Sequence, residues 1–386
     1  MLRDGYRTFL ASIGDALHVT AHSHHPWPDV TRAAHLRYWD DSARLTNRKW
    51  QEKVFGEVVP EAQAHVARHL GLADPKLFAF APNTHEFVAR LYSCLDWSGA
   101  PRVLTTASEF HSFARQTRRL EETGRLQVTR VPVEPYATFR ERFARALGDP
   151  HHMVFLSQVF FDSSFVVERL DGLLAGVPAD TIVAIDGYHA FMAIPVDLGT
   201  LGRRVFYTAG GYKYAQAGEG ACFLSIPEDC KLRPIFTGWY SDFGQLSGAQ
   251  GAAVGYGPDA MRFWGSTFDA SGLYRFNAVM RWLRDLEVTA REIHAHVEGL
   301  ERRFLDGLAG AALARLPVAA LTPPAGQPRG NFLTFDLDGA EDVERRLAAN
   351  GVIVDRRGRR LRFGFGVYHD DAFVDALLAR LPEALA

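Results

Sequence analysis

Residues 204–226 read RVFYTAGGYKYAQAGEGACFLSI, two apolar runs separated by a glycine-rich loop that holds one lysine. Continuous apolar runs of this length are typical of strands that are buried on both faces of a sheet. Similar runs occur earlier in the chain, at 77–80, 102–106, 127–133, 153–157 and 181–186. Stretches with helical spacing lie between several of them. The pattern predicts an α/β fold with a mostly parallel, doubly wound sheet.

The carboxyl-terminal part of the chain has a different character. A long stretch with helical spacing begins near residue 271, a loop rich in proline and glycine follows, and strand and helix candidates then alternate. A chain of 386 residues is also long for a single hydrophobic core. We therefore expect an amino-terminal arm (1–30), a large α/β domain (31–270) and a small α+β domain (271–386). The small domain should begin with one long helix.

The composition is that of an ordinary globular protein, with 23% charged residues, 47% apolar residues and a formal net charge of −2. No global basic field indicates a nucleic acid or a membrane surface as partner. No apolar run reaches the roughly 18 residues that a membrane span requires. Cys94, Cys222 and Cys230 have no CxxC spacing, so neither a disulfide framework nor a zinc knuckle is indicated. We predict a cytoplasmic protein without a metal site.

The lysine in the glycine-rich loop is unusual for this chain. Only five of its 43 basic residues are lysines, and Lys213 lies between Tyr212 and Tyr214 with glycines on both sides. Arginine can supply charge, but only lysine forms a Schiff base, which it does once desolvation lowers its pKa. Lys213 is therefore a candidate for covalent bonding to a carbonyl compound.

Other polar and aromatic residues follow the predicted strands where each strand ends. In an open α/β sheet, ligands bind at the carboxyl ends of the strands, so these residues are expected to meet in one site. The candidates are Asn83, Thr84, Phe110, Ser112, Ser157, Asp186, His189, Tyr212 and Lys213.

Several of these residues also have ordinary structural interpretations, as helix caps for Thr84 and Asp186 and as core for Phe110. Together, however, they describe a site for pyridoxal phosphate. Lys213 would hold this cofactor as an imine, and Asp186 would keep its ring nitrogen protonated. Thr84, at the start of a helix, would bind the phosphate, and Phe110 would stack on the ring.

Two segments, AIDGYHAFMAIPVDL (184–198) and YTAGGYKYAQAGEGACFL (207–224), resemble the class V aminotransferase superfamily of pyridoxal-phosphate enzymes, most of all kynureninase. The resemblance rests on an aspartate and a histidine three residues apart, followed by Tyr-Lys-Tyr with a glycine-rich tail. It implies fold type I, pyridoxal 5'-phosphate as cofactor, and Lys213, Asp186 and His189 as catalytic residues. It also implies a small amino acid as substrate and a homodimer with the active site at the interface.

Six further segments match in order: PNTHEFVARL, SEFHSF, LSQVFF, FTGWYSDF, FWGSTF and LRFGFGVYHD. The resemblance implies cofactor contacts at Asn83, Thr84, Phe110, Ser112, Ser157, Tyr212 and Trp239, and at Ser266 and Thr267 of the neighbouring subunit. It also implies that Arg362 holds the substrate carboxylate. Arginine suits that task because its planar guanidinium can pair a carboxylate through two hydrogen bonds.

The reaction remains open among classes that share these residues. A kynureninase-like hydrolase that cleaves a carbon–carbon bond is the lead. The alternatives are a class V aminotransferase, a lyase or epimerase, and a cofactor-binding homologue without turnover. The chain has Phe113 where kynureninases have aspartate, and Phe161-Asp162-Ser163 where they have Tyr-Thr-Gly, so the substrate side chain also remains open. A cysteine desulfurase is disfavoured because no cysteine follows Cys230.

The segment TAHSHHPWP (20–28) contains three closely spaced histidines, His22, His24 and His25. A zinc site needs ligands that converge and further groups that orient them. We expect these histidines to line the active-site entrance or the substrate pocket, with zinc binding as the alternative.

Overall fold

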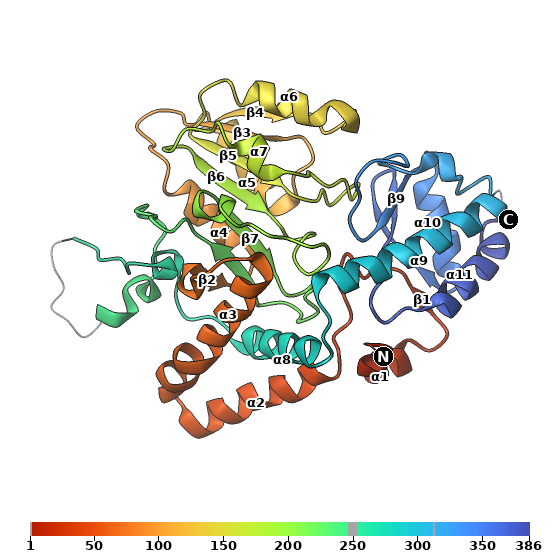
Figure 1. The fold of residues 1–386 in the computed structure, drawn as a ribbon, viewed down its shortest axis with the longest axis horizontal. Helices are drawn as coiled ribbons and strands as arrows, with labels where there is room; N and C mark the ends of the chain where they lie inside the picture. The colour runs from red at the N-terminus through yellow and green to blue at the C-terminus, as the bar shows by residue number, and fades with distance from the viewer. Residues whose placement is uncertain (1, 246–252, 312) are drawn as a thin grey trace.

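The computed structural model describes residues 2–245, 253–311 and 313–386 (Figure 1). Within these ranges, seven strands form one sheet in the order β2-β8-β7-β6-β5-β3-β4. Neighbouring strands are parallel except at β8, which is antiparallel to both β2 and β7. The strands are β2 Phe78–Ala81, β3 Arg102–Thr106, β4 Gln127–Val131, β5 Met153–Ser157, β6 Ile182–Asp186, β7 Phe206–Gly210 and β8 Cys222–Ser225. The predicted α/β class with a mostly parallel sheet is confirmed.

The central strands β5, β6 and β7 are buried along their whole length, as the continuous apolar runs predict. The helices of this part are α2 Val30–Leu45, α3 Val59–Leu70, α4 Thr84–Tyr92, α5 His111–Glu122, α6 Phe139–Ala146, α7 Leu170–Leu174 and α8 Ser271–Asp285. On the inner side of α5, the Phe113 ring stacks on Phe155 of β5 with centroids 3.7 Å apart. Phe113 is therefore a core residue that joins a helix to the sheet.

A second, three-stranded antiparallel sheet lies in the carboxyl-terminal part, in the order β11-β12-β9. Its strands are β9 Leu333–Asp336, β11 Asp355–Arg357 and β12 Arg360–Phe363, and its helices are α9 Ala290–Ala311, α10 Ala340–Ala349 and α11 Asp371–Ala384. The amino-terminal arm joins this part, because β1 (Leu17–His18) pairs in parallel with β10 (Val352–Ile353). Figure 1 shows α1 (Arg7–Ile13) on the same side of the molecule. The domain limits remain a prediction.

The single long helix expected after residue 271 is wrong: the structure has two helices there. Helix α8 ends at Asp285, Glu287 adopts a left-handed backbone with φ 56°, and α9 begins at Ala290. A capping box causes the restart, since the Thr289 amide donates to Glu292 at 3.0 Å and the Thr289 hydroxyl accepts from the Arg291 amide. Helix α8 packs against α2 and α3, and α9 packs against α11 (Figure 1).

Candidate active site

The carboxyl ends of the parallel strands and the segments after them surround one cavity. Nine residues predicted from the sequence line it: Asn83, Thr84, Phe110, Ser112, Ser157, Asp186, His189, Tyr212 and Lys213. Three residues that the sequence did not single out complete the lining: Val159, Phe161 and Tyr188. The sheet therefore brings together residues from five separate segments of the chain.

Lys213 lies in the turn after β7 and is buried. Its Nζ forms a hydrogen bond with Nε2 of His189. Burial, with a further contribution from the positive charge of Arg362, lowers the pKa of Lys213 to about 7. A Cβ on Gly210, the last residue of β7, would overlap the Tyr188 hydroxyl, so the absence of a side chain at Gly210 lets Tyr188 pack against the start of the lysine turn. The lysine is therefore held in place with a large neutral fraction at neutral pH.

Asp186 ends β6 directly beside Ser157 of β5, and its Oδ1 accepts a hydrogen bond from the Tyr188 amide at 2.8 Å. Burial raises the pKa of Asp186, which the positive charge of Lys213 partly offsets. Burial and the neighbouring Lys213 lower the pKa of His189 well below its usual value, so this imidazole is neutral. Its Nδ1 is buried and has no hydrogen-bond partner in the described part of the chain.

Two helices point their amino termini at the cavity. Asn83 caps α4 by accepting the Glu86 amide at 3.2 Å, and Thr84 is its first residue. Ser112 lies in the first turn of α5, which begins directly after Phe110. Free backbone N–H groups and the helix dipoles make such a place favourable for an anion. An anionic group is therefore expected between Thr84 and Ser112.

Glu109 is a buried carboxyl group that the sequence interpretation missed. It lies directly before Phe110 but does not line the cavity. It accepts hydrogen bonds from the Thr106 hydroxyl at 2.7 Å and from the Ser157 amide at 3.2 Å, and its Oε2 forms a hydrogen bond of 2.5 Å with the Ser157 hydroxyl. Burial raises the pKa of Glu109 to about 8. An acid between a strand end and the stacking phenylalanine is the signal that could have identified it.

Arg362 lies on β12, beside the cavity but outside its lining. It is buried, forms an ion pair with Asp355 and donates to the carbonyl oxygen of Phe161. Its Nε has no hydrogen-bond partner among the residues that the structure describes. The guanidinium also lies 5.8 Å from the ring centroid of Phe332. Arg362 thus reaches the cavity wall through Phe161.

The three histidines of the arm lie on this side of the molecule. His22 is fully buried, stacks on Phe332 at 4.5 Å between centroids, and lies 3.7 Å from Asp355. His24 stacks on Tyr212 at 5.0 Å. The described residues contain no group of three or more His, Cys, Asp or Glu that could hold a metal ion. Equally, no helix in these ranges is both long and apolar enough to cross a membrane.

A model of the aminotransferase class-V family matches residues 20–370. The chain belongs to this family. Among curated protein sequences none matches, but many solved structures share the fold. The cystine C–S lyase C-DES, in complex with its reaction product cysteine persulfide, is 19% identical with a TM-score of 0.81, covering 96% of this chain and 98% of that chain. The apo cysteine desulfurase of Thermococcus onnurineus NA1 is 15% identical with a TM-score of 0.81, covering 100% and 97%. At these identities the similarity establishes the fold.

Class V aminotransferase proteins are pyridoxal-phosphate enzymes, and this chain is one of them. The donor set of the cavity fits that cofactor: two helix amino termini suit its phosphate, and buried Asp186 suits a positively charged ring nitrogen. The unpartnered Nδ1 of His189 is a further polar atom that a bound group could satisfy. The cavity volume is about 50 Å³, with the rings of Phe110 and Phe161 5.3 Å apart in its wall. Side chains of the lining must therefore shift to admit the cofactor ring.

Three predicted residues of this class V chain lie elsewhere. Trp239 is 45% exposed, and Ser266 and Thr267 line a different cavity, together with Gly238 and Arg90. The sequence resemblance assigns Ser266 and Thr267 to the site of a neighbouring subunit, and that assignment remains a prediction. So does the cofactor contact of Trp239.

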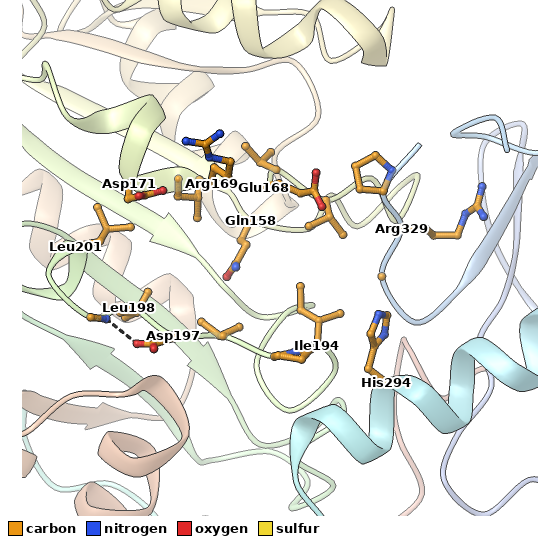
Figure 2. A pocket seen from close by; sticks show the side chains of 18 of the residues that line it. Gln158, Glu168, Arg169, Asp171, Ile194, Asp197, Leu198, Leu201, His294 and Arg329 are labelled. Carbon is orange, nitrogen blue, oxygen red and sulfur yellow. Dashed lines mark hydrogen bonds between the residues drawn. The ribbon is translucent and has the colours of Figure 1, made fainter. Parts of the chain in front are cut away.

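A second and larger cavity, of about 840 Å³, lies between the large sheet and the carboxyl-terminal part (Figure 2). Gln158 and Asp197 come from the side of the large sheet, and His294 comes from α9. Lys213 does not line this cavity, so its size does not make it the centre of the chemistry. Its lining residue Gln158 lies in the chain between Ser157 and Val159, which line the active-site cavity, and accepts a hydrogen bond from the Tyr207 hydroxyl at 2.8 Å.

Proposed function

We propose that this class V enzyme acts on an amino acid and that Lys213 is both the covalent anchor of the cofactor and the base. The lead reaction in this proposal is a kynureninase-like hydrolysis of a carbon–carbon bond. The observation that carries the proposal is the buried Lys213, hydrogen-bonded to His189 in a cavity that also contains Asp186. Bound pyridoxal phosphate supplies an electron sink for the bond broken at the substrate.

The residues around Lys213 support its role in moving a proton. With a pKa of about 7, a substantial fraction of Lys213 is neutral at physiological pH and can take a proton from the substrate α-carbon. Neutral His189 can accept a hydrogen bond from Lys213 and so holds Nζ in one place. Asp186, when ionised, stabilises a positive ring nitrogen beside it.

The substrate carboxylate is assigned to Arg362, as the resemblance implies. Asp355 already pairs with this guanidinium, so a substrate carboxylate must share it or displace Asp355. The unpartnered Nε offers one donor that Asp355 does not use. We therefore expect modest affinity for the carboxylate group and a strong dependence on the rest of the substrate.

The substrate side chain would meet aromatic rings. Phe110 and Phe161 pack edge to face in the cavity wall, and His111 lies 5.6 Å from Phe161. Such walls favour a flat, apolar side chain. This supports an aryl-ketone amino acid, which is the kind of substrate that a kynureninase-like hydrolase cleaves.

Aminotransferase and lyase chemistry use the same residues and remain the alternatives. Desulfurase chemistry with an enzyme thiolate is not supported by the cysteines. Burial raises the pKa of both Cys94 and Cys222 to about 12, and it also raises the pKa of Cys230. A thiol with a raised pKa is a poor nucleophile. A lyase reaction that uses no cysteine of this chain remains compatible with this site, and C-DES, which shares the fold, is named a cystine C–S lyase.

The proposal is tested with the purified protein and pyridoxal phosphate. Borohydride should fix the cofactor on a peptide that contains Lys213. The matched control is Lys231→Ala, which removes an exposed lysine and should leave this fixation unchanged. Alanine released from an aryl-ketone amino acid supports hydrolysis. Accumulation of the aminated cofactor indicates transamination, and pyruvate with ammonia indicates a lyase. Fixation on another lysine, or on none, would overturn the assignment of Lys213.

A homodimer is part of the proposal. Ile235, Phe236 and Trp239 are large apolar side chains that are 68%, 63% and 45% exposed. Ile235 and Phe236 line the same cavity as Ser266 and Thr267, the residues assigned to a neighbouring subunit. Burial of this surface against a second copy would remove apolar area from water. Light scattering should give twice the chain mass, and a monomer that still turns over substrate would contradict it.

A further inference from the structure

The contacts of Glu109 place it behind Ser157, one layer away from the cavity. Its Oε1 accepts the Ser157 amide at 3.2 Å and the Thr106 hydroxyl at 2.7 Å, and its Oε2 contacts the Ser157 hydroxyl at 2.5 Å. The carboxyl group is only 5% exposed. No ion pair joins it to a basic side chain within the described ranges. Apart from the bond from the Ser157 amide, the bonds of Glu109 therefore depend on where hydroxyl and carboxyl hydrogens lie.

The hydrogens on this cluster can be assigned. The Ser157 amide can only donate, so Oε1 of Glu109 accepts its hydrogen bond, and in a protonated carboxyl group the carbonyl oxygen is the better acceptor. The Thr106 hydroxyl accepts the Ser108 amide at 3.2 Å, which leaves its own hydrogen free to point at Oε1. Because two donors can be directed at Oε1, the contacts favour Oε2 as the position of a proton on Glu109, facing the Ser157 hydroxyl. The contact between Oε2 and Ser157 thus reverses its donor when Glu109 gains or loses a proton.

The two arrangements present different groups to the cavity. When Glu109 is ionised, Ser157 donates its hydrogen to Oε2, and only lone pairs of its oxygen remain for the cavity. When Glu109 is protonated, it donates to Ser157, whose own hydrogen is then free to point into the cavity. Ser157 lines that cavity beside Asp186, its partner in the strand register.

We propose that Glu109 is a positioning residue that sets the direction of the Ser157 hydroxyl, and thereby decides whether the site beside Asp186 offers the cofactor a hydrogen-bond donor or only an acceptor. The inference rests on the proposed function, because it assumes that pyridoxal phosphate binds next to Lys213. It assigns a role to a side chain that touches neither cofactor nor substrate.

The electrostatic surroundings of Glu109 place its change of protonation between pH 7 and pH 9. Burial is the main cause that raises the pKa of Glu109 to about 8, and the negative charge of Asp186 on β6 raises it further. Its hydrogen bonds from Ser157 on β5 and Thr106 on β3 act in the opposite direction. At pH 7 the protonated form then predominates about tenfold, and at pH 9 the ionised form does. The donor arrangement of Ser157 therefore belongs to neutral pH.

Glu109→Gln tests this arrangement directly. The glutamine carbonyl can still accept from the Ser157 amide and Thr106, and its NH₂ group can only donate to the Ser157 hydroxyl. The variant therefore holds Ser157 in the arrangement of protonated Glu109 at every pH. Glu301→Gln is the matched control, since Glu301 is 6% exposed, its pKa is also raised by burial to about 8, and it lies on α9 and does not line the cavity that contains Lys213.

The measurements are the absorption spectrum of the Lys213-bound cofactor and the cofactor dissociation constant, each from pH 6 to 9.5. Between pH 7 and pH 9 the cofactor dissociation constant should rise in all three proteins. The rise should be about tenfold larger in the parent and in E301Q than in E109Q, because only in those two does the Ser157 hydroxyl stop donating into the cavity. Lys213 titrates in all three proteins, so the difference between them isolates Glu109. Adding Ser157→Ala to the parent and to E109Q should abolish the difference between the pH dependences of their cofactor dissociation constants. If E109Q fails to fold, S157A alone tests the idea, because it should lack the extra rise that the parent shows.

The outcomes separate this inference from the proposed function. A parent protein that does not bind pyridoxal phosphate at Lys213 would overturn both. Normal binding with the same pH dependence in the parent and E109Q would overturn the role of Glu109 alone. A change in E109Q that persists equally when Ser157 is replaced by alanine would show that Glu109 acts on the fold and not through the hydroxyl.

Discussion

Replacing Arg362 by glutamine is expected to make Lys213 harder to deprotonate. Burial is the first reason why the pKa of Lys213 is about 7, and the positive charge of Arg362 is the second. At that pKa half of the Lys213 side chains are neutral at pH 7, compared with roughly one in 2,500 for an ordinary lysine. Loss of one nearby like charge in a buried site shifts a pKa by about one unit. The midpoint in R362Q should therefore rise to about 8.

The assay is covalent capture of added pyridoxal phosphate by the apoprotein, followed by absorbance from pH 5 to 9. Capture needs a neutral Lys213 and no substrate, so the loss of the carboxylate contact at Arg362 does not confuse the result. At pH 6 the neutral fraction falls from about one in ten to about one in a hundred, so capture by R362Q should be about tenfold slower.

The control is Arg360→Gln. Arg360 lies on the same strand but pairs with Asp162 and Glu134, and it is not among the main groups that shift the pKa of Lys213. Glutamine in place of Arg362 removes the positive charge and keeps a polar side chain with an N–H donor at this position. Equal midpoints for the parent, R360Q and R362Q would refute the reasoning.

Three further changes test the packing and the charges. Phe113→Ala removes the ring that stacks on Phe155 and should lower the free energy of unfolding by about 3–5 kcal/mol in urea denaturation; a loss below about 1 kcal/mol would contradict its core role. Gly210→Ala places a Cβ on top of the Tyr188 hydroxyl, so it should weaken cofactor binding, measured by an absorbance titration. The control is Gly176→Ala, because a Cβ at Gly176 meets nothing within 4 Å. Glu301 has a pKa raised from 4.5 to about 8. The contribution of Glu301 to the free energy of unfolding is therefore fully present below about pH 4.5. It is lost as the pH rises through about 8, at up to about 1.4 kcal/mol per pH unit. Thermal melts of E301Q should consequently decline less between pH 5 and 8 than those of the parent, and parallel curves would contradict the shift.

The fold was largely predictable because apolar runs mark buried strands. The runs around 153–157, 181–186 and 204–209 became β5, β6 and β7, all fully buried. The break between α8 and α9 was missed because apolar periodicity continues across it. The local signal was present, however, since Thr289 and Glu292 have the spacing of a capping box. Periodicity shows which face is buried, whereas capping shows where a helix begins.

The candidate site was predictable to the extent that strand ends meet at one edge of the sheet. The ion pair between Asp355 and Arg362 was not foreseen, although the turn at Gly358 and Arg359 aligns β11 and β12 so that these two residues face each other. Glu109 was missed for a different reason: it acts on Ser157 from outside the cavity. A pattern of residue types identifies groups that touch a ligand far better than groups that position those groups.

The residues around Lys213 and the proposed carboxylate-binding residue belong to different parts of the chain. Lys213 and Asp186 come from the large sheet, whereas Arg362 comes from β12 and His22 from the amino-terminal arm. The arm is fixed to that second part through the pairing of β1 with β10 and the bridge between Thr20 and Gly364. A Cβ on Gly364 would overlap Nδ1 of His22, so the arm and β12 are packed as one unit. Changes in this unit should alter how tightly the substrate carboxylate is held while Lys213 and its neighbours stay in place. Carboxylate affinity should therefore depend on the contacts among His22, Asp355 and Arg362, whereas the choice of side chain should depend on the rings of Phe110 and Phe161.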